Sequence, residues 1–161
     1  MSIKSEMQEL DRYDKRILTL LQSDGRMSNQ DLADAIGLSP SPCLRRVKAL
    51  EDAGLITGYR ALVDSKKLGY SLMALIYISM DQHTPERFAS FEGAIAAIPE
   101  VLECLLITGQ QADYQLKVIV ADMDGYQNLL LNKITRIKGV TGVHTSFVLR
   151  RVVDKTEVPV G

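Results

Sequence analysis

The sequence predicts an α+β protein in two parts, a helical N-terminal third and a C-terminal part in which strands and helices alternate. Up to Gly54, apolar residues recur at helical spacing. Beyond residue 70, apolar runs of strand length alternate with helical patterns. The polar, glycine-containing segment 65–70 indicates a linker. We therefore expect an N-terminal domain over 1–64 and a C-terminal domain over 71–161.

The composition is typical of a folded globular protein that does not attract its partners by bulk charge. The 161 residues are 46% hydrophobic and 24% charged, and the formal net charge is −1. Any DNA contact must therefore come from a local basic patch. Cys43 and Cys104 stand far apart without further ligands, so we expect no disulfide, metal or cofactor. With no membrane-spanning stretch or signal-peptide core, a cytoplasmic protein is expected.

Three short helices are predicted in the N-terminal third. The first covers 11–25 and is capped by Asp11. Ser28 begins the second, which ends at the turn residue Gly37. The third begins after Ser39, where two prolines fit the first turn because amide hydrogens there have no intrahelical partner. Two helices joined by a tight glycine turn, after a first supporting helix, form the helix-turn-helix pattern.

The third helix is expected to present a polar face to DNA. At about 100° per residue, the residues placed inward are Cys43, Leu44, Val47 and Leu50. Arg45 points away from them and is the first candidate for reading a base edge, with guanine the preferred partner. Lys48 is better placed for a phosphate. The expected DNA contacts are Ser28, Asn29, Ser39, Ser41, Pro42, Arg45, Arg46, Lys48 and Ala49.

Two points near this helix have alternative interpretations. Arg46 lies toward the flank, where it either contacts phosphate or pairs with Glu51 or Asp52. The arginine pair is otherwise only a solvated helix face, but the three-helix context favours a docking face. Residues 55–64 alternate enough to form a strand or small wing after the third helix.

The C-terminal part is predicted to have a ferredoxin-like βαββαβ fold. Strands are expected at 71–80, 101–108, 113–121 and 140–150, and helices at 84–98 and 122–137. Both helices then cover one face of an antiparallel sheet. The first strand is apolar on both faces, so a second copy is expected to cover the open face. Such a homodimer would pair two helix-turn-helix units on a two-fold-symmetric DNA site.

The connection between the two middle strands suits a small ligand with amino-acid chemistry. Gly109 allows close backbone approach, so that neighbouring amides could hold a carboxylate. Asp113 could hold an ammonium group. The alternative is a hairpin loop in which both residues serve only the turn. The expected effector contacts are Thr108, Gly109, Gln110, Gln111, Ala112, Asp113 and Tyr114.

Several stretches resemble the Lrp/AsnC family of feast/famine regulators, especially its leucine-responsive branch. They are LDRYDKRILTLLQSDGR, NQDLADAIGLSPSPCLRRVKALEDAGLITGY, ITGQQADYQLKV and KGVTGVHTSFVL, and SPSPCLRRVKALE is the most specific part. The resemblance implies a DNA-binding domain joined to an effector-sensing domain. It also implies dimers that often associate into octamers, amino acids as effectors, and an effector site between dimers near Gly109 and Asp113.

The leading hypothesis is a sequence-specific transcription regulator that responds to an amino acid or a related metabolite. One alternative is an architectural protein that wraps DNA without an effector. Another is an enzyme similar to the sirohaem decarboxylases, which resemble this family in fold and use histidines. His83 and His144 keep that alternative open, although no metal-ligand spacing, phosphate loop or catalytic triad occurs. We therefore expect no catalytic residues and no enzyme activity.

Overall fold

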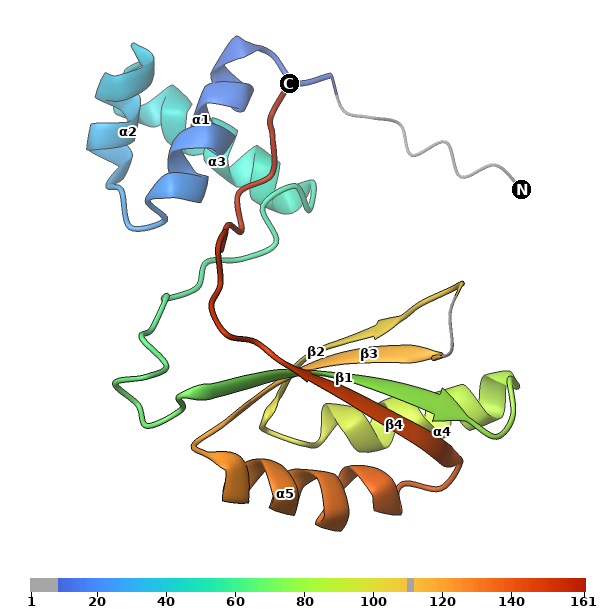
Figure 1. The fold of residues 1–161 in the computed structure, drawn as a ribbon. Helices are drawn as coiled ribbons and strands as arrows, with labels where there is room; N and C mark the ends of the chain where they lie inside the picture. Colours follow the sequence, from blue (N-terminus) through green and yellow to red (C-terminus); the bar gives the residue numbers. More distant parts are fainter. Residues whose placement is uncertain (1–8, 110–111) are drawn as a thin grey trace. The chain divides into compact units, whose positions relative to one another are not determined.

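The computed structural model describes residues 9–109 and 112–161, which divide into two compact units (Figure 1). One unit runs to Leu62 and also takes in Val153–Gly161. The other is Val63–Val152. The residues after 152 thus group with the N-terminal helices, whereas the limits expected from the sequence assign them to the C-terminal domain. The chain passes from the first unit to the second and back again.

The first unit is built on three helices, α1 (Arg12–Ser23), α2 (Asn29–Ile36) and α3 (Pro40–Asp52). Asp11 caps α1 in a capping box with Asp14, and Ser28 caps α2. Gly37, at φ +74°, makes the left-handed turn into α3. The buried core of this unit consists of Ile17, Leu32, Ala33, Cys43 and Leu50. The predicted helix-turn-helix is confirmed.

Three details of this unit differ from the sequence-based expectations. The first helix ends at Ser23, two residues earlier than predicted. Leu44 is 57% exposed and does not face the core, so its inward placement is wrong. At about 100° from the centre of the apolar face, it lies at the edge of that face. Residues 55–64 contain no strand, because their alternation finds no partner strand in the described part of the chain.

Hydrogen bonds hold the returning C-terminal segment, residues 153–161, on α1. The Gln22 side chain donates from Nε2 to the Val158 carbonyl oxygen at 3.0 Å and accepts the Val158 N–H at 2.7 Å. Ser23 Oγ lies 3.2 Å from Glu157 Oε1. The side-chain amide of Gln22 therefore pairs with this backbone much as a neighbouring strand would.

The second unit has the predicted βαββαβ order. Its elements are β1 (Leu72–Met80), α4 (Pro85–Ala96), β2 (Val101–Leu106), β3 (Tyr114–Val120), α5 (Met123–Asn132), a 3₁₀ turn (Ile134–Arg136) and β4 (Val140–Phe147). The strands form one antiparallel sheet in the order β2-β3-β1-β4. The helix expected over 122–137 is shorter, since α5 ends at Asn132 and only the 3₁₀ turn continues it.

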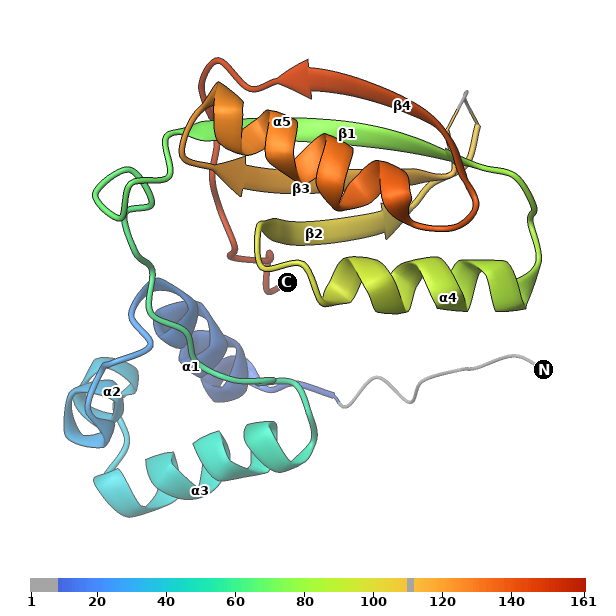
Figure 2. The ribbon, with the colours of Figure 1, turned by 90° about the horizontal axis from the view of Figure 1, so that it is seen from below.

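Both helices cover the same face of the sheet (Figures 1 and 2). Alternate residues of β1 and β3 point into this layer and are buried. The main core residues are Ala74, Ile76, Ile78, Phe91, Ile95, Tyr114, Leu116, Val118, Leu129 and Ile134. On the other face of β1, Met73, Leu75 and Tyr77 are only half-buried within this chain. Along β1 this open face is apolar where a solvated strand would be polar, although the neighbouring strands place Lys117 and Ser146 beside Leu75.

Candidate DNA interface and effector turn

The predicted outward face of α3 is exposed. Ser41, Arg45, Lys48 and Ala49 are all exposed, whereas Cys43 and Leu50 on the opposite side are buried. Arg45 makes no ion pair or hydrogen bond to any described residue that would hold its guanidinium against the protein. The same side of the helix therefore offers a hydroxyl, a guanidinium and an ammonium group to solvent.

The start of α2 is bonded to the start of α3. Asn29 Nδ2 donates to the Pro40 carbonyl oxygen at 2.8 Å, and Ser28 Oγ accepts the Asp31 N–H at 3.1 Å. These two expected DNA contacts thus also fix the geometry of the turn. Ser39, the N-cap of α3, is exposed and makes no side-chain cap bond, so its hydroxyl is available to a ligand. Pro42 is half-buried in the first turn.

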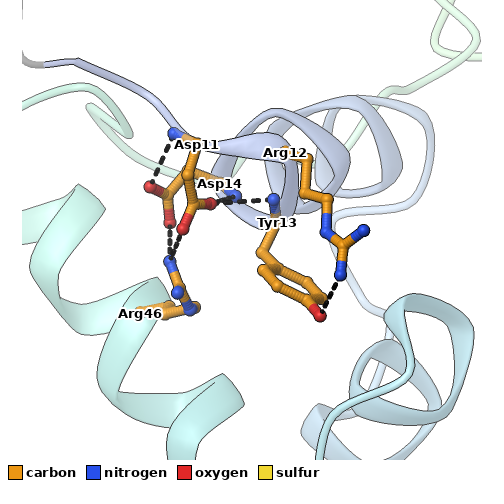
Figure 3. Close-up of polar contacts among 5 residues, drawn as sticks. All are labelled: Asp11, Arg12, Tyr13, Asp14 and Arg46. Carbon is orange, nitrogen blue, oxygen red and sulfur yellow. Dashed lines mark hydrogen bonds and ion pairs between the residues drawn. The ribbon is translucent and has the colours of Figure 1, made fainter.

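Arg46 lies between α3 and α1 and is bound by two aspartates (Figure 3). Its Nη1 atom is 2.8 Å from Asp11 Oδ2 and 2.8 Å from Asp14 Oδ1. The guanidinium carbon also lies 5.2 Å from the centre of the Tyr13 ring. The expected pairing with Glu51 or Asp52 is therefore wrong, because the partners are Asp11, the N-cap of α1, and Asp14 in its first turn.

The contacts in this cluster stabilise the charged forms of Arg46 and Asp11. The hydrogen bond to Asp14, followed by the one to Asp11, raises the pKa of Arg46 above its ordinary value. The Asp14 backbone N–H, with the Tyr13 N–H and Arg46 contributing further, lowers the pKa of Asp11. Arg46 thus serves to join α1 to α3, and its side chain is only one-third exposed.

A tyrosine after α3 binds the C-terminal end of that helix. Tyr59 donates its hydroxyl to Glu51 Oε1 at 2.8 Å. Burial, and then the hydrogen bond to Glu51, raise the pKa of Tyr59 to about 12. A Cβ atom on Gly25 would lie 3.3 Å from the Tyr59 ring, so the ring also lies close to the turn after α1. The segment that was expected to form a strand is held by this side chain instead.

The turn expected to bind an effector, residues 108–114, connects the end of β2 to the start of β3. Thr108 and Gly109 are exposed, and Gly109 has φ +97°. Ala112 is half-buried and Tyr114 is buried, with its hydroxyl donating to Glu92 Oε1 at 2.7 Å. Burial, then the bond to Glu92, raises the pKa of Tyr114. The expected contacts Gln110 and Gln111 lie outside the described residues.

Asp113 already has partners in this turn. Its Oδ2 atom accepts the Met80 N–H at 2.7 Å, and Oδ1 lies 2.7 Å from His83 Nε2. The backbone N–H of Asp113 donates to Ile78 O at 2.8 Å. The antiparallel pairing of β1 with β3 brings these residues together. The sequence did not identify His83 as a partner of Asp113. Spacing alone gives no sign of it, since His83 precedes Asp113 by an entire helix and strand.

Within the described ranges, none of the helices could span a bilayer. Nor do three or more histidine, cysteine, aspartate or glutamate side chains gather there as a metal ion would require. Burial raises the pKa of the thiols of Cys43 and Cys104, which favours the protonated, weakly nucleophilic form.

Two family models match the chain. Residues 10–57 match a winged helix-turn-helix DNA-binding model, and residues 73–158 match the Lrp/AsnC ligand binding domain. The Bkd operon transcriptional regulator of Pseudomonas aeruginosa is 41% identical over 153 residues, which cover 95% of this chain and 99% of that protein. The leucine-responsive regulatory protein of Salmonella typhimurium is 41% identical over 151 residues, 94% of this chain and 92% of that protein.

Solved structures agree with these matches. A transcriptional regulator of Neisseria meningitidis, solved in complex with L-Met, has a TM-score of 0.89 at 36% identity and covers 94% of this chain and 97% of that chain. AsnC of E. coli has a TM-score of 0.84 at 30% identity, covering 92% of this chain and 98% of that chain. The chain therefore belongs to the Lrp/AsnC family and is a DNA-binding transcription regulator that responds to a small-molecule effector.

Proposed function

We propose that α3 lies in the major groove of operator DNA and reads it chiefly through Arg45. This proposal depends on one observation. On the side of α3 that faces away from the core, the guanidinium of Arg45 is exposed and unpaired, with Ser41 and Lys48 as its neighbours. Arg45 is long enough for a bidentate contact with guanine O6 and N7. Lys48 contacts phosphate, and the exposed start of α3 supplies the Ser39 and Ser41 hydroxyls.

The other expected contacts have more limited roles in this proposal. Ser28 is exposed at the start of α2 and meets the phosphate backbone, whereas Asn29 is half-buried and acts by holding the start of α3 through Pro40. Pro42 and Ala49 provide small surfaces that let the helix approach the groove. Arg46 is assigned to the protein framework, because Asp11 and Asp14 already neutralise it.

The effector in this proposal is a free amino acid bound at the turn that contains Gly109 and Asp113. The exposed glycine, at φ +97°, supplies accessible backbone for a carboxylate. The Asp113 carboxylate supplies the charge for an ammonium group, and since His83 is its exposed partner, the ligand competes with His83 for Oδ1. The L-Met complex of the N. meningitidis regulator supports this ligand class.

The active assembly is proposed to be a homodimer formed through the open face of the sheet, with octamers as tetramers of dimers. The half-buried Met73, Leu75 and Tyr77 on that face support it, since nothing in the described chain covers them completely. Two heads then bind a two-fold-symmetric site, and the effector shifts the balance between assemblies. Because it acts on chromosomal DNA, we place the protein in the cytoplasm. As a regulator like its named relatives, it is proposed to have no enzyme activity.

A thermal-shift screen of the common amino acids, followed by operator binding, tests the whole proposal. A specific effector raises the unfolding temperature by mass action and changes operator affinity or oligomer distribution. Asp113→Asn should abolish both effects while operator binding without effector remains. Glu103→Gln, a carboxylate change on the neighbouring strand β2, is the matched control. If no amino acid alters stability, assembly or DNA binding, the amino-acid proposal fails. Equal binding to operator and random DNA would favour the architectural alternative.

A further inference from the structure

Leu44 is an apolar side chain at the border between the buried face of α3 and the side that carries Arg45. It is 57% exposed, and no other large hydrophobic side chain of α1, α2 or α3 is exposed. A single exposed leucine is common on protein surfaces, so its exposure acquires meaning here only from its neighbours on the helix. The side chain of Leu44 is therefore available for a contact outside the three-helix unit.

The neighbours of Leu44 identify that contact. In a helix, residues three and four positions apart are adjacent, so Leu44 lies between Ser41 and Lys48 and beside Arg45. These four residues, Ser41, Leu44, Arg45 and Lys48, form what we name the docking face. The acids of α3 all lie near its C-terminal end, where Glu51, which is bound by Tyr59, and Asp52 follow Lys48 by three and four positions. The first two turns of the helix, which carry Leu44 beside a hydroxyl and two cations, contain no acid and fit a nucleic acid surface.

We infer that Leu44 contacts the C5-methyl group of a thymine next to the base read by Arg45. This inference rests on the proposed function, in which α3 lies in the major groove. The thymine methyl is the apolar group of the major groove, and cytosine lacks it at the same ring position. Leu44 is thereby a specificity-determining residue, which selects thymine by burying a methyl group. Arg45 and Leu44 together read a guanine and a nearby thymine.

Replacement of single thymines by deoxyuridine tests this inference, because only the C5-methyl group is lost. The operator is first obtained by repeated selection of bound fragments from a random pool. Each thymine of a half-site is then replaced in turn, and the Kd is measured for the full-length protein. We expect one position at which the replacement weakens binding about fourfold, as for burial of one methyl group. Leu44→Ala should bind the thymine and deoxyuridine operators equally at that position.

Leu62→Ala is the matched control, since Leu62 is 86% exposed and lies outside α3. It should keep the full preference for thymine. The inference is overturned if no thymine is sensitive, or if Leu44→Ala keeps the same ratio of Kd values. A change of oligomeric state in Leu44→Ala with an unchanged ratio would instead assign Leu44 to a contact between chains. If the wild-type protein selects no sequence at all, the proposed operator binding fails as well, which separates the two results.

Discussion

Neighbouring arginines in α3 have opposite environments. Arg45 is exposed and forms no ion pair within the described part of the chain, whereas Arg46 is bound by Asp11 and Asp14. A side chain without partners in the protein can donate hydrogen bonds to a base edge without first breaking bonds to the protein. A residue whose bonds join α1 to α3 must lose them first. Two identical side chains, one position apart, are therefore expected to serve binding and folding separately.

Alanine substitution of each arginine should separate these roles. Arg45→Ala should weaken operator binding by roughly 1–3 kcal/mol, the range for a bidentate base contact, with unchanged stability. Arg46→Ala should lower the free energy of unfolding by about 1 kcal/mol, because the partly exposed ion pairs are screened by solvent. Urea unfolding and operator titration measure the two effects. Loss of binding in Arg46→Ala without loss of stability would contradict the framework role.

The partners of Arg46 show what the sequence conceals at this scale. The outward direction of Arg45 follows from helical periodicity, which needs only local spacing. The pairing of Arg46 with Asp14 spans 32 positions and depends on how α1 crosses α3. Leu44 was misplaced for a different reason, because a residue about 100° from the apolar centre can lie on either side of the boundary.

Two glycines with nearly equal φ angles have different surroundings. Gly139 has φ +99° and Gly109 has φ +97°. A Cβ atom at Gly139 would lie 2.6 Å from Arg87 Cδ and 3.0 Å from Asp81 Oδ1, whereas at Gly109 it would meet nothing within 4 Å. Alanine at either position incurs the same backbone strain, but only Gly139→Ala adds a steric clash.

Gly139→Ala should therefore destabilise the second unit more than Gly109→Ala does. We expect about 1 kcal/mol for Gly109→Ala, from the positive φ alone, and about 2–3 kcal/mol for Gly139→Ala. Thermal unfolding of the two variants gives the comparison. Equal losses would mean that the Arg87 and Asp81 side chains move aside at no cost.

At the level of whole elements, the segment after α3 departs most from the sequence-based prediction. Its alternating apolar residues were expected to form a strand, but a strand is stable only with a partner, and none pairs with it in the described chain. Tyr59 holds it instead by bonding to Glu51. The helices and the four strands of the sheet were predicted well because their periodicity reflects burial on one face. The early end of α5 was not, since an apolar pattern continues through the 3₁₀ turn.

The tyrosine that holds this segment gives the stability a pH dependence in alkali. Its pKa is raised to about 12 from an unfolded value near 10. A group whose pKa is higher in the folded state stabilises the fold fully below the unfolded pKa. That contribution is lost as the pH rises through the folded pKa, here between about pH 10 and 12. Urea unfolding across this range should show falling stability, with a shallower fall in Tyr59→Phe. An identical pH profile for the variant would show that Tyr59 ionises as it does in the unfolded chain.

At the scale of the whole molecule, the open sheet face is the surface through which we propose that two copies associate. Leu75 lies on this face, on the central strand β1, paired with Lys117 of β3 and Ser146 of β4. Leu75→Glu should convert the proposed dimer to monomers. Each copy would then bury one additional carboxylate in the interface, at a cost in free energy. Sedimentation velocity measures the change, and circular dichroism should show an intact fold.

The matched control for that substitution is Leu131→Glu, since Leu131 is 50% exposed on α5, which covers the opposite side of the sheet. It should leave the dimer intact, although it is free to affect association of dimers. A dimeric Leu75→Glu variant with unchanged mass would refute assembly through the open face. The monomeric variant should also lose affinity for a two-fold-symmetric operator through loss of paired binding.

The attachment of residues 153–161 to α1 affects the order in which the protein can be completed during synthesis. Domains generally fold in the order in which the ribosome releases them. The three N-terminal helices emerge first, but the backbone that pairs with Gln22 follows the entire 63–152 unit. The DNA-binding head therefore reaches its final form only after the effector-binding unit has been translated, so a prematurely terminated chain carries an unfinished head.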